Sequence, residues 1–254
     1  MTRAALIGVT GRMGRALVRA AAGFPRLSIS AAVAAPGNPA LGRDAGELAG
    51  VAPLGVTVTA DLERALEAAD VAIDFSVAAA AAANLRACRA ARRPLLIGTT
   101  GLASELSGEL EAAARDIAVL VAANTSIAVT LLIELVRSAA AVLPADFDID
   151  ILEAHHRGKR DAPSGTALAL AAAARAARPS ADAREIAVSA LRAGDLVGEH
   201  TVLFTGPGEQ LLVRHRASDR AIFARGALAA ALWLESRPAG RYEMHDFIVG
   251  NSKT

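Results

Sequence analysis

The segment Arg3-Ala4-Ala5-Leu6-Ile7-Gly8-Val9-Thr10-Gly11-Arg12-Met13-Gly14 decides the fold predicted for the first part of the chain. It begins as a short apolar strand, and residues that favour a helix follow it from Arg15 to Ala22. A strand that runs into a glycine turn and then a helix is the phosphate-binding unit of dinucleotide-binding sheets. The spacing is G-x-x-G-x-x-G, so one glycine of the commonest fingerprint is replaced. The turn can still bind a pyrophosphate through backbone amides at the helix N-terminus.

We therefore expect a dinucleotide to contact this turn and two later segments, Gly98 to Thr100 and Ala123 to Ser126. In parallel sheets, ligands bind beyond the carboxyl ends of the strands, and both later segments follow predicted strands. The alternative is a glycine turn that binds nothing. The expected cofactor-binding residues are Gly8, Val9, Thr10, Gly11, Arg12, Met13, Gly98, Thr99, Thr100, Ala123, Asn124, Thr125 and Ser126.

Apolar runs alternate with helical stretches through the first half of the chain, which predicts a Rossmann-like, doubly wound parallel sheet of the α/β class. After Ser126 the pattern changes to a long helix followed by several strands, which predicts a second, α+β domain for substrate binding and oligomerisation. We expect the first domain to span 1–126, completed by 221–254, and the second to span 127–220. The predicted strands are Leu27 to Val33, Val71 to Phe75, Leu95 to Ile97, Ile117 to Ala122, Phe147 to Glu153, Ile186 to Leu191, Thr201 to Phe204 and Gln210 to Arg216, and the predicted helices include Leu62 to Ala69, Ala78 to Ala91, Ser104 to Arg115, Ile127 to Val142 and Ile222 to Ser236.

Composition argues against several classes of protein. The 254 residues carry a formal net charge of +1, which gives no overall attraction to nucleic acid or to a membrane surface. The first residues lack the long apolar segment of a signal peptide, and the short apolar runs favour no membrane span. Cys88 is the one cysteine, so the chain forms no internal disulfide. We expect a cytoplasmic protein that binds neither nucleic acid nor membrane.

A second informative segment is Glu153-Ala154-His155-His156-Arg157-Gly158-Lys159-Arg160-Asp161-Ala162-Pro163-Ser164-Gly165-Thr166. It holds two imidazoles and three cations within six positions, and burying such a cluster without partners would be costly. Ser164 is a suitable N-cap, so Gly165 and Thr166 open a helix whose first N–H groups suit an anion. The segment predicts a strand-to-helix loop that binds a carboxylate or phosphate. A solvated basic loop is the alternative.

Taken together, these motifs closely resemble the dihydrodipicolinate reductase family. The resemblance covers nearly the whole chain, and the fourteen-residue segment from Glu153 to Thr166 is its most specific part. The other matching motifs are G-x-x-G-R-M-G ending at Gly14, Asp74-Phe75-Ser76, Gly98-Thr99-Thr100-Gly101, Ala122-Ala123-Asn124-x-Ser126 and Arg192-Ala193-Gly194-Asp195-x-Val197-Gly198-Glu199-His200.

The resemblance implies NADH- or NADPH-dependent reduction of 4-hydroxy-tetrahydrodipicolinate to tetrahydrodipicolinate, in lysine and diaminopimelate biosynthesis. It implies that His155 and Lys159 are catalytic, although the sequence leaves open which of them delivers the proton. It further implies that His156, Gly165 and Thr166 hold the substrate carboxylates, and that the protein is a homotetramer. Other functions that share the N-terminal features are a related reductase of another carboxylated imine and a non-catalytic dinucleotide sensor.

The chain departs from the family pattern at three places. Ala34 and Ala35 stand where an acidic residue and sometimes an arginine contact the adenosine ribose. Arg12 remains available for a 2′-phosphate, which favours NADPH slightly over NADH. Thr125 replaces a frequent aromatic residue beside the nicotinamide, and the segment Arg184 to Ala190 is shorter than expected.

Two pairs of neighbouring residues, Glu199 with His200 and His155 with His156, could be mistaken for metal ligands. Glu199 and His200 are expected to be structural. His155 and His156 are adjacent on a strand and point to opposite faces, so they form a poor metal clamp, and no metal requirement is predicted.

Overall fold

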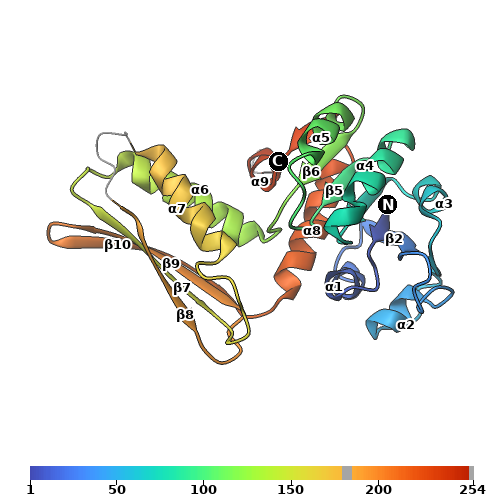
Figure 1. Ribbon diagram of the computed structural model, residues 1–254, viewed down its shortest axis with the longest axis horizontal. Helices are drawn as coiled ribbons and strands as arrows, with labels where there is room; N and C mark the ends of the chain where they lie inside the picture. The colour runs from blue at the N-terminus through green and yellow to red at the C-terminus, as the bar shows by residue number, and fades with distance from the viewer. Residues whose placement is uncertain (179–184, 252–254) are drawn as a thin grey trace. The chain divides into compact units, whose positions relative to one another are not determined.

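The computed structural model describes residues 1–178 and 185–251, so Arg184 of the shortened segment lies outside the described residues. The chain divides into two compact units. The first comprises Met1–Ser126 with Ala221–Thr254, and the second comprises Ile127–Arg220. Figure 1 shows the elements of each unit in the colours of the chain.

A parallel sheet forms the centre of the first unit and confirms the predicted α/β class. In the part of the chain that the structure describes, seven strands follow the order β11-β6-β5-β4-β1-β2-β3, and every pair is parallel. The order changes direction at β1 and β4, and ligands of doubly wound sheets bind at this point. The strands are β1 (Thr2–Ile7), β2 (Leu27–Val33), β3 (Val58–Thr59), β4 (Val71–Asp74), β5 (Leu95–Ile97), β6 (Ala118–Val121) and β11 (Gly240–Tyr242).

Helices cover both faces of this sheet, because its strands are apolar on both sides. One buried cluster joins the sheet to α1, α2, α8 and α9, and a second joins its other face to α3, α4 and α5. The second cluster includes Cys88, which is fully buried among apolar side chains, and this burial raises the pKa of its thiol. The helices are α1 (Arg12–Ala21), α2 (Ala45–Ala49), α3 (Leu62–Glu67), the 3₁₀ turn η1 (Ala78–Ala80), α4 (Ala81–Ala90), α5 (Leu106–Ala114), α8 (Ala221–Leu234) and α9 (Met244–Asn251).

The second unit is a mixed four-stranded sheet with two helices on one face. Its described strands follow the order β10-β9-β7-β8; β7 pairs with β8 in parallel and with β9 antiparallel. Figure 1 shows α6 and α7 side by side along this sheet, and a buried apolar cluster joins both helices to β7 and β9. The elements are α6 (Ile127–Val142), β7 (Asp148–His155), α7 (Gly165–Ala177), β8 (Ala187–Arg192), β9 (Gly198–Gly206) and β10 (Glu209–Ala217).

The structure differs from the predicted elements in two ways. Strand β7 continues through His155, so the histidine-lysine segment begins on the strand rather than in the loop after it. The backbone of β7 is held to its end by β8, since His155 lies opposite Arg192. The elements α2, β3, β11 and α9 were not predicted.

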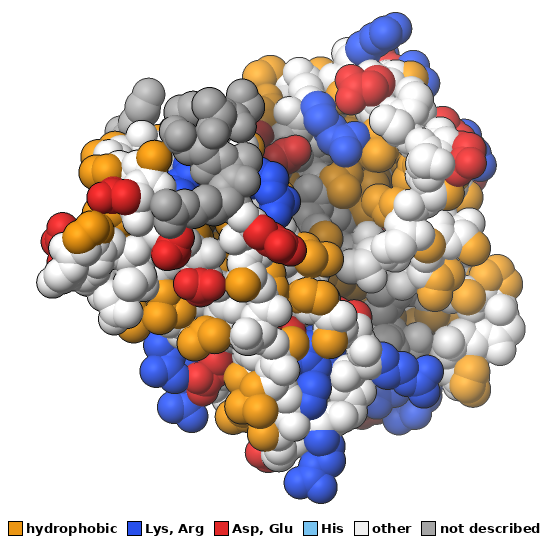
Figure 2. All heavy atoms as spheres, turned by 60° about the vertical axis from the view of Figure 1, so that its left-hand side comes forward, with side chains coloured by type: hydrophobic (Ala, Val, Ile, Leu, Met, Phe, Trp, Pro, Cys, Tyr) orange, Lys and Arg blue, Asp and Glu red, His pale blue; other side chains and the backbone are white. Residues whose placement is uncertain are grey.

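The surface carries charges of both signs. On the face that Figure 2 shows, described side chains of both signs are present among apolar and uncharged ones. Of the helices in the described part of the chain, none has both the length and the apolar character needed to span a bilayer.

Candidate active site

Strand β7 presents two functional side chains to the same side of its sheet. Residues two apart on a strand share a face, so Glu153 and His155 lie on the face of Ile149 and Ile151, which packs against α6 and α7. Both are buried, with exposed fractions of 2% for Glu153 and 8% for His155. The side chain of His155 is therefore not part of a solvated loop.

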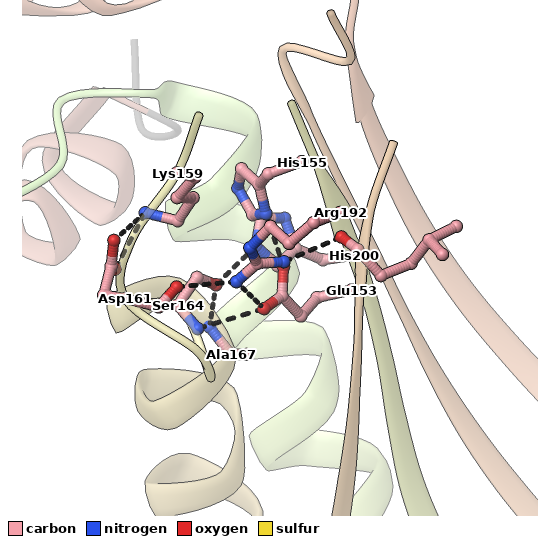
Figure 3. A network of polar contacts seen from close by, with 9 residues as sticks. Glu153, His155, Lys159, Asp161, Ser164, Ala167, Arg192 and His200 are labelled. Atoms are coloured by element: carbon pink, nitrogen blue, oxygen red, sulfur yellow. Dashed lines mark hydrogen bonds and ion pairs between the residues drawn. The ribbon is translucent and has the colours of Figure 1, made fainter. Parts of the chain in front are cut away.

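A hydrogen-bond network makes the burial of His155 possible. The Nδ1 atom of His155 contacts Oε2 of Glu153, and the Arg192 guanidinium binds the same carboxylate with both terminal nitrogens, at 2.7 and 3.0 Å. The backbone N–H of Ser164 donates to Oε1 of Glu153 at 3.2 Å. Figure 3 shows these groups converging on Glu153 from β7, β8 and the start of α7. A buried carboxylate is tolerated when it is paired and hydrogen-bonded in this way.

His200 on β9 lies beside His155. The two rings meet edge to face with centroids 5.1 Å apart, and Nε2 of His200 is 3.2 Å from Oγ of Ser164. Ser164 also caps α7, because its Oγ accepts from the N–H of Ala167 at 3.2 Å, which confirms the predicted N-cap. The sequence alone predicts a structural role for His200 and gives no sign that it lies next to His155. Strand register supplies the missing signal, since His200 pairs with Glu153.

Lys159 lies in the loop after β7, and its Nζ binds both carboxylate oxygens of Asp161 at 2.8 Å. The Lys159 side chain is 22% exposed, whereas Arg157 and Arg160 are exposed. The same loop is tied to β8, because Arg192 Nη2 donates to the carbonyl of Asp161 at 2.6 Å. The network around Glu153 thus also fixes the segment that carries Lys159.

Burial and charge alter the acidity of this cluster. Burial lowers the pKa of His155, and the neighbouring Lys159 and Arg192 lower it further, while Glu153 acts in the opposite direction. Burial alone would raise the pKa of Glu153, but hydrogen bonds from Arg192 and His155 outweigh it and leave the pKa below its usual value. Burial and the nearby His155 lower the pKa of His200 to about 4. His155 and His200 are therefore uncharged over most of the neutral range, and Glu153 is ionised.

The residues expected to hold substrate carboxylates lie around this cluster. His156 is half-buried and follows His155 directly, while Gly165 and Thr166 form the first turn of α7. Helix geometry directs the first N–H groups of α7 out of its N-terminal end, where the macrodipole favours an anion. The local structure is therefore suited to a carboxylate.

The glycine turn of the first unit has the shape that the sequence predicts. Gly8 has a φ of +83°, and a Cβ there would lie 2.6 Å from the carbonyl oxygen of Phe75. A Cβ on Gly14 would lie 2.4 Å from the carbonyl oxygen of Gly8, so only glycine lets α1 pack this closely on β1. The first turn of α1, with Arg12 and Met13, begins at Gly11. Such a tight turn at a helix N-terminus fits the pyrophosphate of a dinucleotide.

The other two expected cofactor segments follow β5 and β6, at the same edge of the sheet as the glycine turn. Gly98 and Thr99 are buried and Thr100 is exposed; the hydroxyl of Thr99 contacts Asp74. Thr125 is buried, and its hydroxyl donates to the carbonyl of Phe223 at 2.7 Å, so this side chain points inward.

The end of β2, where Ala34 and Ala35 stand in place of an acidic ribose contact, lies beside the glycine turn. Ala34 is buried, and its N–H donates to the carbonyl of Thr59 at 2.9 Å, whereas Ala35 is exposed. The Asn38 amide is 3.3 Å from the hydroxyl of Thr10. Neither alanine offers a side-chain hydrogen bond to a ribose.

Comparison with known proteins gives consistent matches over both units. Residues 2–125 match the family described as dihydrodipicolinate reductase, N-terminus, and residues 128–248 match its C-terminus. The chain belongs to the dihydrodipicolinate reductase family. A 4-hydroxy-tetrahydrodipicolinate reductase of Anaeromyxobacter dehalogenans strain 2CP-1 is 45% identical over 98% of both chains, and one of Alkalilimnicola ehrlichii is 46% identical over 97% of this chain and 98% of the relative.

A solved structure of the same family supports the fold. The dipicolinate-bound dihydrodipicolinate reductase from Paenisporosarcina sp. TG-14 superposes with a TM-score of 0.81 at 24% identity, over 96% of this chain and 97% of that one. An amine dehydrogenase from Mycobacterium smegmatis shares the fold more distantly, with a TM-score of 0.65 at 16% identity.

Family membership confirms the resemblance and the expected activity. The chain is an NAD(P)H-dependent oxidoreductase of the family that reduces 4-hydroxy-tetrahydrodipicolinate in lysine and diaminopimelate biosynthesis. Among the described residues, no three His, Cys, Asp or Glu side chains are grouped to hold a metal ion. The expected lack of a metal requirement stays a prediction.

Proposed function

We propose that the cluster around His155 delivers the proton and binds the substrate in the reduction of 4-hydroxy-tetrahydrodipicolinate. When bound, the reduced nicotinamide supplies the hydride. We assign His155 and Lys159 as the proton donors. The main support for this assignment is their position at the end of β7 and in the loop that follows it. There a buried imidazole and an ammonium group lie beside the N-terminus of α7. A donor aimed at developing negative charge lowers the barrier to reduction.

The substrate carboxylates are assigned to His156, Gly165 and Thr166. A dicarboxylate has two anionic groups, and the loop offers both cationic side chains and the positive end of α7. Binding at the start of α7 would place the substrate next to His155, since Ser164 is hydrogen-bonded to Glu153. This arrangement explains why the motif joins a basic loop directly to a helix start.

Replacement of Lys159 by methionine tests the assignment of the loop. We expect kcat to fall about 100-fold or more, because the variant removes an ammonium group while keeping the aliphatic stem. Arg160→Met is the matched control: Arg160 is the exposed neighbour of Lys159, and its loss should change kcat less than threefold. Steady-state rates with saturating cofactor give the kcat of both variants. Equal effects of the two variants would mean that Lys159 contributes only general charge.

We propose that the cofactor site is formed by the glycine turn and the segments after β5 and β6, with a slight preference for NADPH over NADH. Arg12 is exposed at the start of α1 and can meet a 2′-phosphate, whereas Ala34 and Ala35 give no contact that would favour a free ribose hydroxyl. The proposed contacts are Gly8, Val9, Thr10, Gly11, Arg12, Met13, Gly98, Thr99, Thr100, Ala123, Asn124, Thr125 and Ser126.

Arg12→Ala should raise the KM for NADPH about three- to tenfold and leave the KM for NADH unchanged, since only NADPH carries the phosphate. The control is Arg26→Ala. Arg26 is exposed at the amino end of β2, on the opposite edge of the sheet. An equal rise in both KM values for Arg12→Ala would place the arginine near the pyrophosphate instead.

We also propose that the protein is a homotetramer whose subunits meet through the face of the second sheet that faces away from α6 and α7. That face displays Leu152, Leu191 and Leu212, with exposed fractions of 47, 57 and 55%, while α6 and α7 cover the other face. Exposed apolar residues on three strands form a surface that a second copy can bury. Sedimentation should give four times the chain mass, and Leu152→Asp should reduce it. Leu168→Asp changes a similarly exposed leucine on α7 and should leave the sedimenting mass unchanged. A wild-type monomer would contradict the proposal.

Finally, we propose a cytoplasmic enzyme whose partners are its small-molecule ligands and copies of itself, with no role in nucleic-acid or membrane binding. The balanced charge of the chain and its single, buried cysteine support this assignment. Recovery of the reductase activity in a membrane fraction of lysed cells would contradict it.

A further inference from the structure

The Glu153 carboxylate uses its whole hydrogen-bonding capacity. An ionised carboxylate has about four acceptor sites. Oε1 accepts from the Ser164 N–H and from Nη2 of Arg192, and Oε2 accepts from Nη1 of Arg192 and contacts Nδ1 of His155. The Arg192 guanidinium and the Ser164 N–H can only donate, and they keep the carboxylate ionised, with a pKa below its usual value. An ionised carboxylate can only accept from His155. The Nδ1 atom of His155 must therefore carry a hydrogen.

We propose that Glu153 and Arg192 are positioning residues for His155. They hold its Nδ1–H, so the proton that the substrate receives comes from Nε2 of the imidazolium form. The inference rests on the catalytic role proposed for His155. Gly198 supports it, because a Cβ at this position would lie 3.0 Å from Nε2 of His155, and the glycine leaves that nitrogen accessible. Neither Glu153 nor Arg192 need touch the substrate for this purpose.

Arg192 has a separate part in the arrangement. Its bidentate contact keeps Glu153 ionised in a buried site, where a lone carboxylate would take up a proton and could then no longer hold Nδ1–H. The guanidinium is itself fixed by the carbonyls of Leu191 and Asp161, at 2.7 and 2.6 Å. Arg192 thus joins the strand that carries His155 to the loop that carries Lys159.

The charged and titratable groups around His155 determine the expected pH behaviour. They are Glu153 on β7, Arg192 on β8, His200 on β9 and Lys159 in the loop. Glu153 is the one anion among these groups, and it raises the pKa of His155 against burial and the two cations. Removing its charge should therefore lower the pKa of His155 further and leave a smaller fraction of imidazolium at neutral pH.

Glu153→Gln is the direct test, with the nitrogen signals of His155 and the pH dependence of kcat as readouts. We expect kcat at pH 7 to fall about 10- to 1,000-fold, which is less than the roughly 10,000-fold loss seen when the carboxylate behind the catalytic imidazole of a serine protease is removed. The substrate KM should change less than threefold. The His155 titration and the descending limb of the kcat profile should both move to lower pH. Glu153→Asp, which keeps the charge, should recover part of the loss.

Glu199→Gln is the matched control. Glu199 precedes His200 on β9 and pairs with Arg214 and Arg216 on the opposite face of the same sheet. Like Glu153→Gln, this variant removes a carboxylate charge that is paired with arginine, but the pair lies on the sheet face opposite His155. This variant should leave the His155 titration and the kcat profile unchanged.

The possible outcomes separate this inference from the proposed role of His155. An unchanged His155 titration in Glu153→Gln overturns the positioning role of Glu153. A shifted titration with unchanged kcat, together with full activity of His155→Gln, shows instead that His155 is not the proton donor. If Glu153→Gln does not fold, nitrogen spectra of the wild-type protein decide: neutral His155 protonated at Nδ1 supports the inference, and protonation at Nε2 overturns it.

Discussion

Replacing His155 with glutamine should lower kcat by about 100- to 10,000-fold while the protein stays folded. Glutamine is close to histidine in size and can still donate a hydrogen bond to the buried Glu153 carboxylate, so the network around Arg192 is preserved. It has no group that gains or loses a proton in the neutral range. The loss should appear in kcat, because the proton is needed only as negative charge develops on the substrate.

His245→Gln controls for the loss of a histidine. His245 is exposed on α9 in the first unit, and its replacement should leave kcat within threefold of the wild-type value. The rates follow from the loss of reduced-nicotinamide absorbance, and circular dichroism checks the fold. A His155→Gln enzyme with more than a third of the wild-type kcat would exclude His155 as the essential acid.

Gly14→Ala should destabilise the first unit by about 1–3 kcal/mol and weaken cofactor binding. The added Cβ would lie 2.4 Å from the carbonyl oxygen of Gly8 and 2.5 Å from Cα of Val9. These backbone atoms belong to the turn after β1, which cannot move aside cheaply because the N–H groups of Gly8 and Val9 both donate to the carbonyl of Val33. Helix α1 would have to shift away from β1, which would also displace the amides proposed to bind the pyrophosphate. The midpoint of chemical unfolding and the dissociation constant for NADPH measure the two effects.

Gly108→Ala is the matched substitution for this prediction. Gly108 is an exposed residue of α5, and a Cβ there meets nothing within 4 Å. Alanine should therefore raise the stability by about 0.5–1 kcal/mol through its higher helix propensity. Similar stability changes for Gly14→Ala and Gly108→Ala would show that the close approach of α1 to β1 contributes little.

Much of the fold was predictable because its signals are local. The apolar run from Ala4 to Ile7 and the glycines after it define β1, the turn and the start of α1 without reference to the rest of the chain. Short elements give no such signal: Val58–Thr59 is too brief to show a period, and Gly240–Tyr242 forms a strand only by pairing with β6.

The chemistry of the site was predictable only in part. The basic loop and its helix start identified His155 and Lys159 as candidates, since both signals lie within fourteen residues. The Glu153–Arg192 pair joins residues 39 positions apart, and only the pairing of β7 with β8 brings them together. A signal for Glu153 was nevertheless present, because a residue two positions before His155 on a strand shares its face. The distant Arg192 and His200 needed the strand register.

The most direct test of the account is the oxidation of NADPH with enzymatically generated 4-hydroxy-tetrahydrodipicolinate, comparing the wild-type protein with His155→Gln and Lys159→Met. The wild-type protein should oxidise one NADPH for each tetrahydrodipicolinate formed. Both variants should bind NADPH with unchanged affinity and turn over at least 100-fold more slowly. Variants as fast as the wild-type protein, or a wild-type protein that binds NADPH without oxidising it, would contradict the account.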